Sequence, residues 1–181
     1  MIADSAATSA LRIGGRAWVF GDEINTDDMY PGFAMKLPVE EAAQHMFDAT
    51  RPEWPSLVRP GDVVVAGKNF GLGSSRPVAQ LFVALGVSCL IAEQFNSLFL
   101  RNAINYGLPA ITLPNARKLI SEGDVIDVDV VQGAGENLTS GAELTFATFP
   151  PFIVEMLRSG GLVNQLVSGG YLRRIETKES S

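Results

Sequence analysis

Three apolar runs of strand length alternate with two segments of helical periodicity in the middle of the chain. The expected strands are residues 62–67, 88–92 and 110–113. The expected helices are residues 76–85 and 95–106, which are followed by Gly86 and Gly107. Glycine is typical of the position just after a helix, so both helices have clear ends. The pattern predicts a β-α-β-α-β unit with parallel strands and right-handed crossovers.

The segments on either side of this unit follow other patterns. Before it, residues 16–20 resemble a strand, residues 39–48 have helical spacing, and the proline-rich residues 51–60 are typical of a connecting loop. After it, residues 125–131 and 144–149 alternate apolar and polar positions, which predicts an antiparallel hairpin with one wet face. The last expected elements are short helices at residues 152–158 and 163–167. The fold class is therefore α/β, with a hairpin added to a central parallel unit.

The composition excludes several classes of protein. Apolar residues make up 46% of the 181 residues, so the chain can form a real core and is not disordered. The formal net charge is −6 and no basic cluster occurs, which argues against nucleic-acid binding. No run reaches the roughly 20 apolar residues that a membrane-spanning helix needs.

The same features predict the domain organisation. We expect a single domain over residues 13–175, with loose tails at residues 1–12 and 176–181. The N-terminal tail lacks the positive start and the long apolar stretch of a signal peptide. We therefore expect a cytoplasmic protein.

The chain contains one cysteine and one histidine. Cys89 lies in an apolar run, which favours a small core side chain over a nucleophile. A single cysteine excludes an internal disulfide and a cysteine-ligated metal cluster built from this chain alone. One histidine cannot form a metal site without carboxylates arranged around it, and we interpret His45 as a surface or half-buried helical residue. The sequence predicts no metal site in this chain.

The first candidate site is the Gly-Leu-Gly-Ser-Ser-Arg stretch at residues 71–76, between a strand and a helix. Glycines let the backbone approach a ligand closely, and the free N–H groups at a helix start favour an anion. Arg76 offers a planar fork for a carboxylate, and Ser74 and Ser75 add two hydroxyls. The pattern indicates either a carboxylate-binding corner or a tight turn in which Ser75 caps the helix and Pro77 occupies its first turn. Neither a Walker loop nor a dinucleotide fingerprint is present.

Two further polar segments are candidates. The loop Asn25-Thr26-Asp27-Asp28 has two carboxylates that could hold a metal or orient a catalytic group, although a turn with local Asx-type bonds is the simpler interpretation. In the expected helix at residues 95–106, polar residues interrupt an apolar pattern at Arg101, Asn102 and Asn105. These residues mark either the solvent edge of the helix or side chains directed at a site.

Three segments, in this order, carry a resemblance to a known family. They are an opening segment at residues 20–27 (FGDEINTD), a signature loop at residues 65–76 (VAGKNFGLGSSR) and a third segment at residues 91–109 (IAEQFNSLFLRNAINYGLP). The chain resembles the small subunits of 3-isopropylmalate dehydratases, which are similar to the swivelling last domain of aconitase. The match runs from about Gly15 to Val131. It implies a three-layer β/β/α swivelling domain.

The resemblance also implies a reaction. In this family a hydroxy acid loses water and regains it at the neighbouring carbon, with a 4Fe-4S cluster on a large subunit acting as a Lewis acid. This chain would bind no cofactor alone, and it would supply Ser74 as the alkoxide base. The substrate-binding residues implied by motif position are Gly73, Ser75, Arg76, Arg101 and Asn102. Asp27 matches a carboxylate that supports a catalytic histidine of the large subunit. Backbone N–H groups and a guanidinium beside Ser74 would stabilise its alkoxide.

The chain departs from the family pattern just after the signature loop. Most members have Glu and then His or Gln after the arginine, whereas Pro77 and Val78 follow Arg76 here. The base and the arginine remain, so we expect a small di-acid substrate, either 3-isopropylmalate or a related alkylmalate. The apolar residues 29–35 are expected to reach over its variable group. The alternatives are a binding or regulatory module that kept the fold, and a small phosphate- or nucleotide-binding protein.

Overall fold

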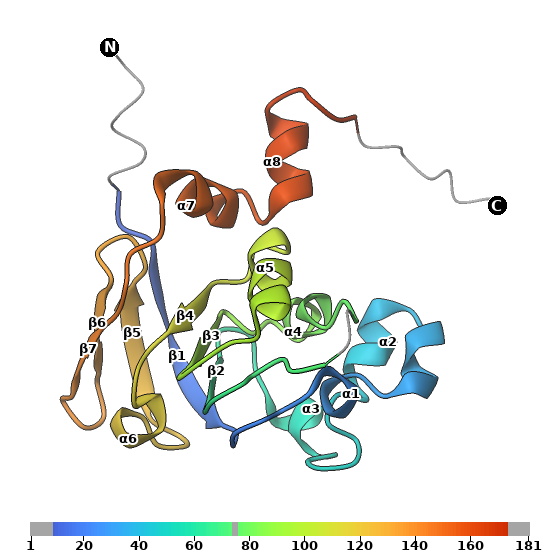
Figure 1. Cartoon of the computed structure of the whole chain (residues 1–181), viewed down its shortest axis with the longest axis horizontal. Coiled ribbons are helices and arrows are strands. Elements are labelled where there is room, and N and C mark those ends of the chain that lie inside the picture. The colour runs from blue at the N-terminus through green and yellow to red at the C-terminus, as the bar shows by residue number, and fades with distance from the viewer. Residues whose placement is uncertain (1–8, 74–75, 174–181) are drawn as a thin grey trace.

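The structure is a computed structural model that describes residues 9–73 and 76–173, and it contains a seven-stranded mixed sheet (Figure 1). The strand order is β4-β3-β2-β1-β5-β6-β7. The strands are β1 (Arg12–Val19), β2 (Val63–Ala66), β3 (Cys89–Ala92), β4 (Ala110–Thr112), β5 (Val125–Asp129), β6 (Ala134–Asn137) and β7 (Glu143–Thr145). Strands β1 to β4 are parallel to one another, whereas β5, β6 and β7 each run antiparallel to the strand before them in the sheet. The predicted central parallel unit is confirmed.

Short helices connect these strands. They are α1 (Thr26–Met29), the 3-10 helix η1 (Gly32–Lys36), α2 (Val39–Ala43), α3 (Trp54–Leu57), α4 (Ala79–Ala84), α5 (Ser97–Asn105), α6 (Ala116–Leu119), α7 (Pro151–Arg158) and α8 (Leu162–Ser168). Helices α4 and α5 are the two crossovers of the parallel unit. In Figure 1 the helices α1 to α5 lie together on one side of the parallel strands, and β5 to β7 lie at the opposite end.

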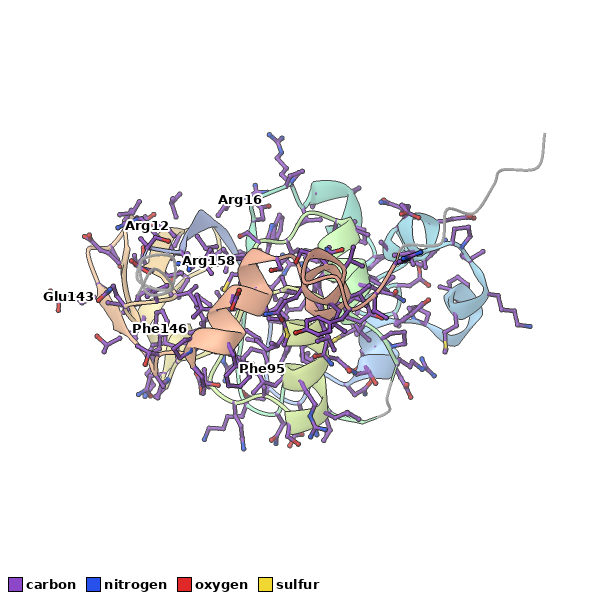
Figure 2. All side chains as sticks on the ribbon, turned by 90° about the horizontal axis from the view of Figure 1, so that it is seen from above. Arg12, Arg16, Phe95, Glu143, Phe146 and Arg158 are labelled. Atoms are coloured by element: carbon purple, nitrogen blue, oxygen red, sulfur yellow. The ribbon has the colours of Figure 1, made fainter. Side chains whose placement is uncertain are left out.

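The two faces of the parallel strands bury different cores. Val64 of β2 and Leu90 of β3 point into a core shared with helices α1 to α5. Their neighbours Val63 and Ile91 point the other way, into a core shared with β5, β7 and α7. The antiparallel strands therefore cover the far face of the parallel strands, which gives the layers helix, parallel sheet and antiparallel sheet. The α/β prediction is confirmed. Figure 2 shows Arg12 and Glu143 at the antiparallel end, away from Phe95.

The predicted hairpin is wrong in its pairing, because a third strand lies inside it. Residues 125–131 do not pair with residues 144–149; β6 lies between β5 and β7 and pairs with both. Asn137, at the end of β6, is fully buried. Its amide donates to Leu119 O (2.9 Å) and Asp124 Oδ2 (2.6 Å), and its Oδ1 accepts from two backbone N–H groups. These bonds hold the turn after β6 and fix the meander.

The proline-rich segment at residues 51–60 is more than a connecting loop. Trp54, in the helical turn α3, is completely buried and packs its ring edge-on against Phe20 and Phe47, with centroid distances of 5.6 and 5.3 Å. Arg51 pairs with Glu122 at 2.5 Å, which ties the start of the segment to the turn before β5. Burial of the indole and this ion pair hold the segment against the domain.

Helix boundaries also differ from the expected ones. The expected helix at residues 39–48 ends at Ala43, and turns follow up to Thr50, among them Phe47, which has a φ of +57°. The two C-terminal helices are confirmed as α7 and α8. The turn between them crosses the end of α5 closely, since a Cβ on Gly107 would lie 2.4 Å from the carbonyl carbon of Gly160. Only glycine fits at this crossing.

Candidate active site

The opening segment and the signature loop are joined by backbone hydrogen bonds. Gly71 N donates to Ile24 O at 2.9 Å, and Thr26 N donates to Leu72 O at 2.9 Å. The Asn25 side chain caps α1 by accepting from Asp28 N at 2.7 Å, so the local Asx-type bond expected for this loop is confirmed. The short helix α1 thus begins where the signature loop passes it.

The third segment supports the signature loop from the other side. Phe70 N donates to Gln94 O at 3.0 Å, and Asn96 N donates to Phe70 O at 2.9 Å. Gly71 has a φ of +82°, and a Cβ there would lie 2.2 Å from Cγ of Phe99 in α5. Only glycine fits here, because it adopts a positive φ without strain and has no Cβ to collide with Phe99. The structure therefore brings together the three segments that carry the resemblance.

Arg76 contacts α1 directly. Its Nη2 lies 3.0 Å from Asp27 Oδ1, and its Nη1 donates to the carbonyl oxygen of Tyr30 at 2.5 Å. The Arg76 side chain is 22% exposed and that of Asp27 is 64% exposed, so the pair lies at the surface with the guanidinium partly covered. Gly73 is also exposed, with a φ of +101°. Ser74 and Ser75, the expected base and its neighbour, lie outside the described residues.

The helix expected at residues 76–85 begins three residues late, at Ala79. The residue before a proline is disfavoured in helical conformation, which keeps Arg76 out of the helix. Pro77 therefore precedes the helix and does not fill its first turn. Val78 is fully buried in the helical core, and its N–H donates to Arg76 O at 2.8 Å. The position where most family members have His or Gln is used here for packing.

Asp22 anchors the start of the signature loop, a role that the sequence analysis missed. Its Oδ1 accepts from Lys68 N at 2.7 Å and from Arg117 Nη2 at 2.6 Å. The bond from Lys68 N, with a smaller contribution from Arg117, holds the pKa of this carboxyl below its usual value. A Cβ on Gly67 would lie 1.9 Å from the same oxygen. The pairing of Asp22 with Gly67 across 45 residues gives no local sequence signal.

Arg101 and Asn102 lie on different sides of α5. Arg101 follows Phe99 by two residues, a rotation of about 200° around the helix, so it points away from the side that meets the signature loop. It lines a groove of about 340 Å³ with Ile153 and Met156 of α7. Asn102 lies only about 60° from Phe99 around the helix and is half-buried. The structure thus brings Gly73, Asp27 and Arg76 together but directs Arg101 elsewhere.

The remaining candidates for metal or nucleophilic chemistry are accounted for by packing. Cys89 is completely buried in β3, as predicted, and burial raises the pKa of its thiol. His45 is half-buried in the turn after α2, where its ring meets Phe33 edge-on at 5.1 Å. Across residues 9–73 and 76–173, no three His, Cys, Asp or Glu side chains are grouped so as to hold a metal ion. None of the helices in this same part is long and apolar enough to cross a membrane.

Comparison with known proteins identifies the family. The family model described as the aconitase C-terminal domain matches residues 24–116, which include the second half of the opening segment and the whole of the signature loop and third segment. The 3-isopropylmalate dehydratase small subunit 1 of Thermotoga maritima is 42% identical over 166 residues, covering 90% of this chain and 99% of that protein. The chain belongs to the aconitase-type swivel-domain family. It is a small subunit of a hydro-lyase, and this name implies a large-subunit partner.

Within this family, identity does not separate the substrates. The methanogen homoaconitase small subunit of Methanothermobacter thermautotrophicus is also 42% identical, over 91% of this chain and 94% of its own length. The crystal structure of 3-isopropylmalate dehydratase (leuD) from Methanocaldococcus jannaschii superposes with a TM-score of 0.82 at 34% identity, covering 88% of this chain and 96% of that one. A 3-isopropylmalate dehydratase small subunit and a homoaconitase small subunit are thus equally identical to this chain, at 42%, so identity alone does not indicate its substrate.

Proposed function

We propose that this chain supplies the proton acceptor and a carboxylate-binding arginine to a two-subunit enzyme that dehydrates and rehydrates a substituted malate. The observation that carries the proposal is the arrangement of Arg76. Its guanidinium is fixed by α1 at the end of the signature loop, and it remains partly exposed beside the exposed Gly73 and Asp27. An ordered guanidinium at the surface suits a di-acid substrate held between this chain and a partner.

The proposed roles follow motif position within the family. Ser74, as an alkoxide, takes the proton from the substrate carbon and becomes a hydroxyl. The substrate hydroxyl on the neighbouring carbon leaves as water after it takes a proton from an acid that the large subunit would supply, and rehydration reverses both proton transfers. Gly73 and Ser75 present backbone and hydroxyl groups to the substrate, and Arg76 holds a carboxylate through its fork. Motif position gives Asn102 and Arg101 a substrate-binding role as well, although Arg101 lines the groove beside α7.

The proposed partner is a large subunit that carries the 4Fe-4S cluster. This chain does not fit such a cluster by itself, because it has one cysteine and that residue is buried in β3. On the partner, the cluster would supply a Lewis acid for the departing hydroxyl. We place the pair in the cytoplasm, because this reducing compartment keeps cysteine thiols free to bind the cluster on the partner. The swivelling domain was expected to begin at residue 13, but β1 begins at Arg12 and Leu11 O accepts from Val130 N at 2.9 Å, so we include both residues in the proposed domain.

The proposed substrate carries an alkyl group. The apolar stretch at residues 29–35 was expected to reach over the variable group, but Met29, Tyr30 and Ala34 are buried in the core. Only Phe33 and Met35, at 57% and 47% exposure, are available to a ligand. Two exposed apolar side chains suit 3-isopropylmalate or a related alkylmalate better than a substrate with a third carboxylate.

Reconstitution with the large subunit tests the proposal. The isolated chain should show no visible absorbance from iron and no hydro-lyase activity, and activity should appear with the partner under anaerobic conditions. Ser74→Ala should assemble normally and lower turnover by roughly two or more orders of magnitude. Ser75→Ala is the matched control, since it removes a hydroxyl one residue away and should do less. Near-normal turnover of assembled Ser74→Ala enzyme would refute the assignment of the base.

A binding or regulatory module that kept the fold is the alternative. Pro77 and Val78, which replace the polar residues of most members, favour it. If this chain forms a complex with the large subunit but the complex hydrates no alkenyl di-acid, the result would support the binding-module hypothesis and refute the enzyme hypothesis.

A further inference from the structure

The helical turn α1 is bonded to the signature loop both before and after Ser74–Ser75. Before them, Thr26 N donates to Leu72 O at 2.9 Å. After them, Arg76 meets Asp27 at 3.0 Å and Tyr30 O at 2.5 Å. One turn of four residues thus contacts the loop on both sides of the proposed base.

The α1 contacts are themselves held by the core. Met29 is completely buried and Tyr30 is 4% exposed, so the carbonyl oxygen that receives Arg76 cannot move without disturbing packed side chains. The Asn25 cap fixes the other end of the turn. Asp27 points from this rigid support, with its carboxylate largely exposed, and meets the guanidinium from the solvent side.

The two contacts together restrict the guanidinium. A hydrogen bond from Nη1 to Tyr30 O alone leaves the group free to rotate about that contact, whereas the ion pair with Asp27 attracts the other terminal nitrogen to one side and so limits this rotation. Arg76 has five N–H groups, and these two contacts leave others for a substrate carboxylate. We infer that Asp27 is a positioning residue that orients Arg76 for the substrate. The inference rests on the proposed function.

This role differs from the one that the family resemblance gives Asp27, which is support of a catalytic histidine on the large subunit. The two roles predict different kinetics. A carboxylate that orients a substrate-binding arginine acts mainly on KM, and it acts only while the arginine is present. A carboxylate that supports the catalytic histidine of the partner acts on turnover, whatever residue stands at position 76.

Steady-state kinetics of the reconstituted pair on an alkylmalate distinguish the roles. Asp27→Asn should lower kcat/KM by roughly ten- to a hundredfold, with most of the loss in KM. On an Arg76→Lys background the same substitution should add little, because its target is gone. Asp28→Asn is the matched control, since it removes a neighbouring carboxylate that has no ion pair within the described residues. A fall in kcat at unchanged KM, an undiminished effect on the Arg76→Lys background, or normal kinetics would each overturn the inference.

A second measurement does not need turnover. In the isolated chain, nuclear magnetic resonance of the Arg76 guanidinium should show slowed rotation about its C–N bonds, and Asp27→Asn should restore fast rotation whereas Asp28→Asn should not. Equal rotation in wild type and Asp27→Asn would overturn the inference even for an active enzyme. If the wild-type pair hydrates no di-acid, the proposed function fails, and this measurement still decides whether Asp27 orients Arg76.

Discussion

Gly71→Ala should destabilise the folded chain by much more than an ordinary glycine substitution. A φ of +82° costs an alanine about 1–2 kcal/mol, because its Cβ crowds the carbonyl in the left-handed region. The new Cβ would also lie 2.2 Å from Cγ and 2.4 Å from Cβ of Phe99. These atoms are at the root of a buried side chain that packs on Phe70, so they cannot move aside cheaply. Overpacking of this kind adds about 1–3 kcal/mol. The expected total is about 2–5 kcal/mol.

Urea denaturation of the isolated chain measures this loss, with Gly123→Ala as the matched control. Gly123 has a φ of +88°, and a Cβ there would have no neighbour within 4 Å, so its substitution costs the strain alone. If the two variants differ by less than about 0.5 kcal/mol, the contact with Phe99 carries no cost and the reasoning is refuted. Phe99→Ala supplies a second check, because it should cost less in the Gly71→Ala chain than in the wild type.

Three further predictions concern other parts of the chain. Asp62→Ala should lower the free energy of unfolding by about 3 kcal/mol, and thermal unfolding measures this loss. The reason is that Oδ2 of this buried carboxylate accepts hydrogen bonds from Arg16, Trp18 Nε1 and Arg59 N at 2.7–3.0 Å. Burial opposes the charged form, but these donors outweigh it and lower the pKa of Asp62. The contribution of Asp62 to the free energy of unfolding should therefore be full above about pH 4 and decline as the pH falls further. Asp62→Asn should lack this pH dependence. Cys89 should resist thiol reagents at pH 8 in the folded chain and react fully in urea; rapid labelling of folded protein would contradict its burial. Arg76→Lys in the reconstituted enzyme should raise KM roughly tenfold and lower turnover, because a lysine cannot bind a carboxylate through two parallel hydrogen bonds. An unchanged KM would show that Arg76 does not bind the substrate.

The parallel unit was predictable because its strands are buried on both faces. Continuous apolar runs such as residues 62–67 need no partner information to be recognised, and the glycines that end the crossovers are local signals. Strand β6 was not predictable, since its residues Ala-Gly-Glu-Asn have no alternating pattern and only Asn137 is buried. The pairing of β6 comes from β5 and β7 and from the buried amide bonds of Asn137.

The helical turn at α3 was missed for a related reason. Prolines in residues 51–60 signal a loop, but the burial of Trp54 among Phe20, Phe47 and Phe82 outweighs that signal. An isolated tryptophan in a proline-rich stretch does not reveal which distant aromatic rings will receive it.

The candidate site was predictable in its members but not in its contacts. Family resemblance selected Asp27 and Arg76 separately, and nothing in the sequence pairs two residues that are 49 positions apart. The contact follows from two long-range facts, namely the bonds between α1 and the signature loop and the proline that keeps Arg76 outside α4. The sequence also gave no reason to separate Arg101 from Asn102, because their difference depends on which side of α5 meets Gly71.

The sheet described above ends on β4 at one edge and β7 at the other, and each of these strands is only three residues long. An edge strand displays unpaired N–H and C=O groups that can recruit a strand from another molecule, and the risk of aggregation grows with the length of the edge. Two short edges offer few such groups. A subunit synthesised apart from its partner exists alone for some time, and during that time the short edges of this sheet give the strands of other copies few groups to pair with.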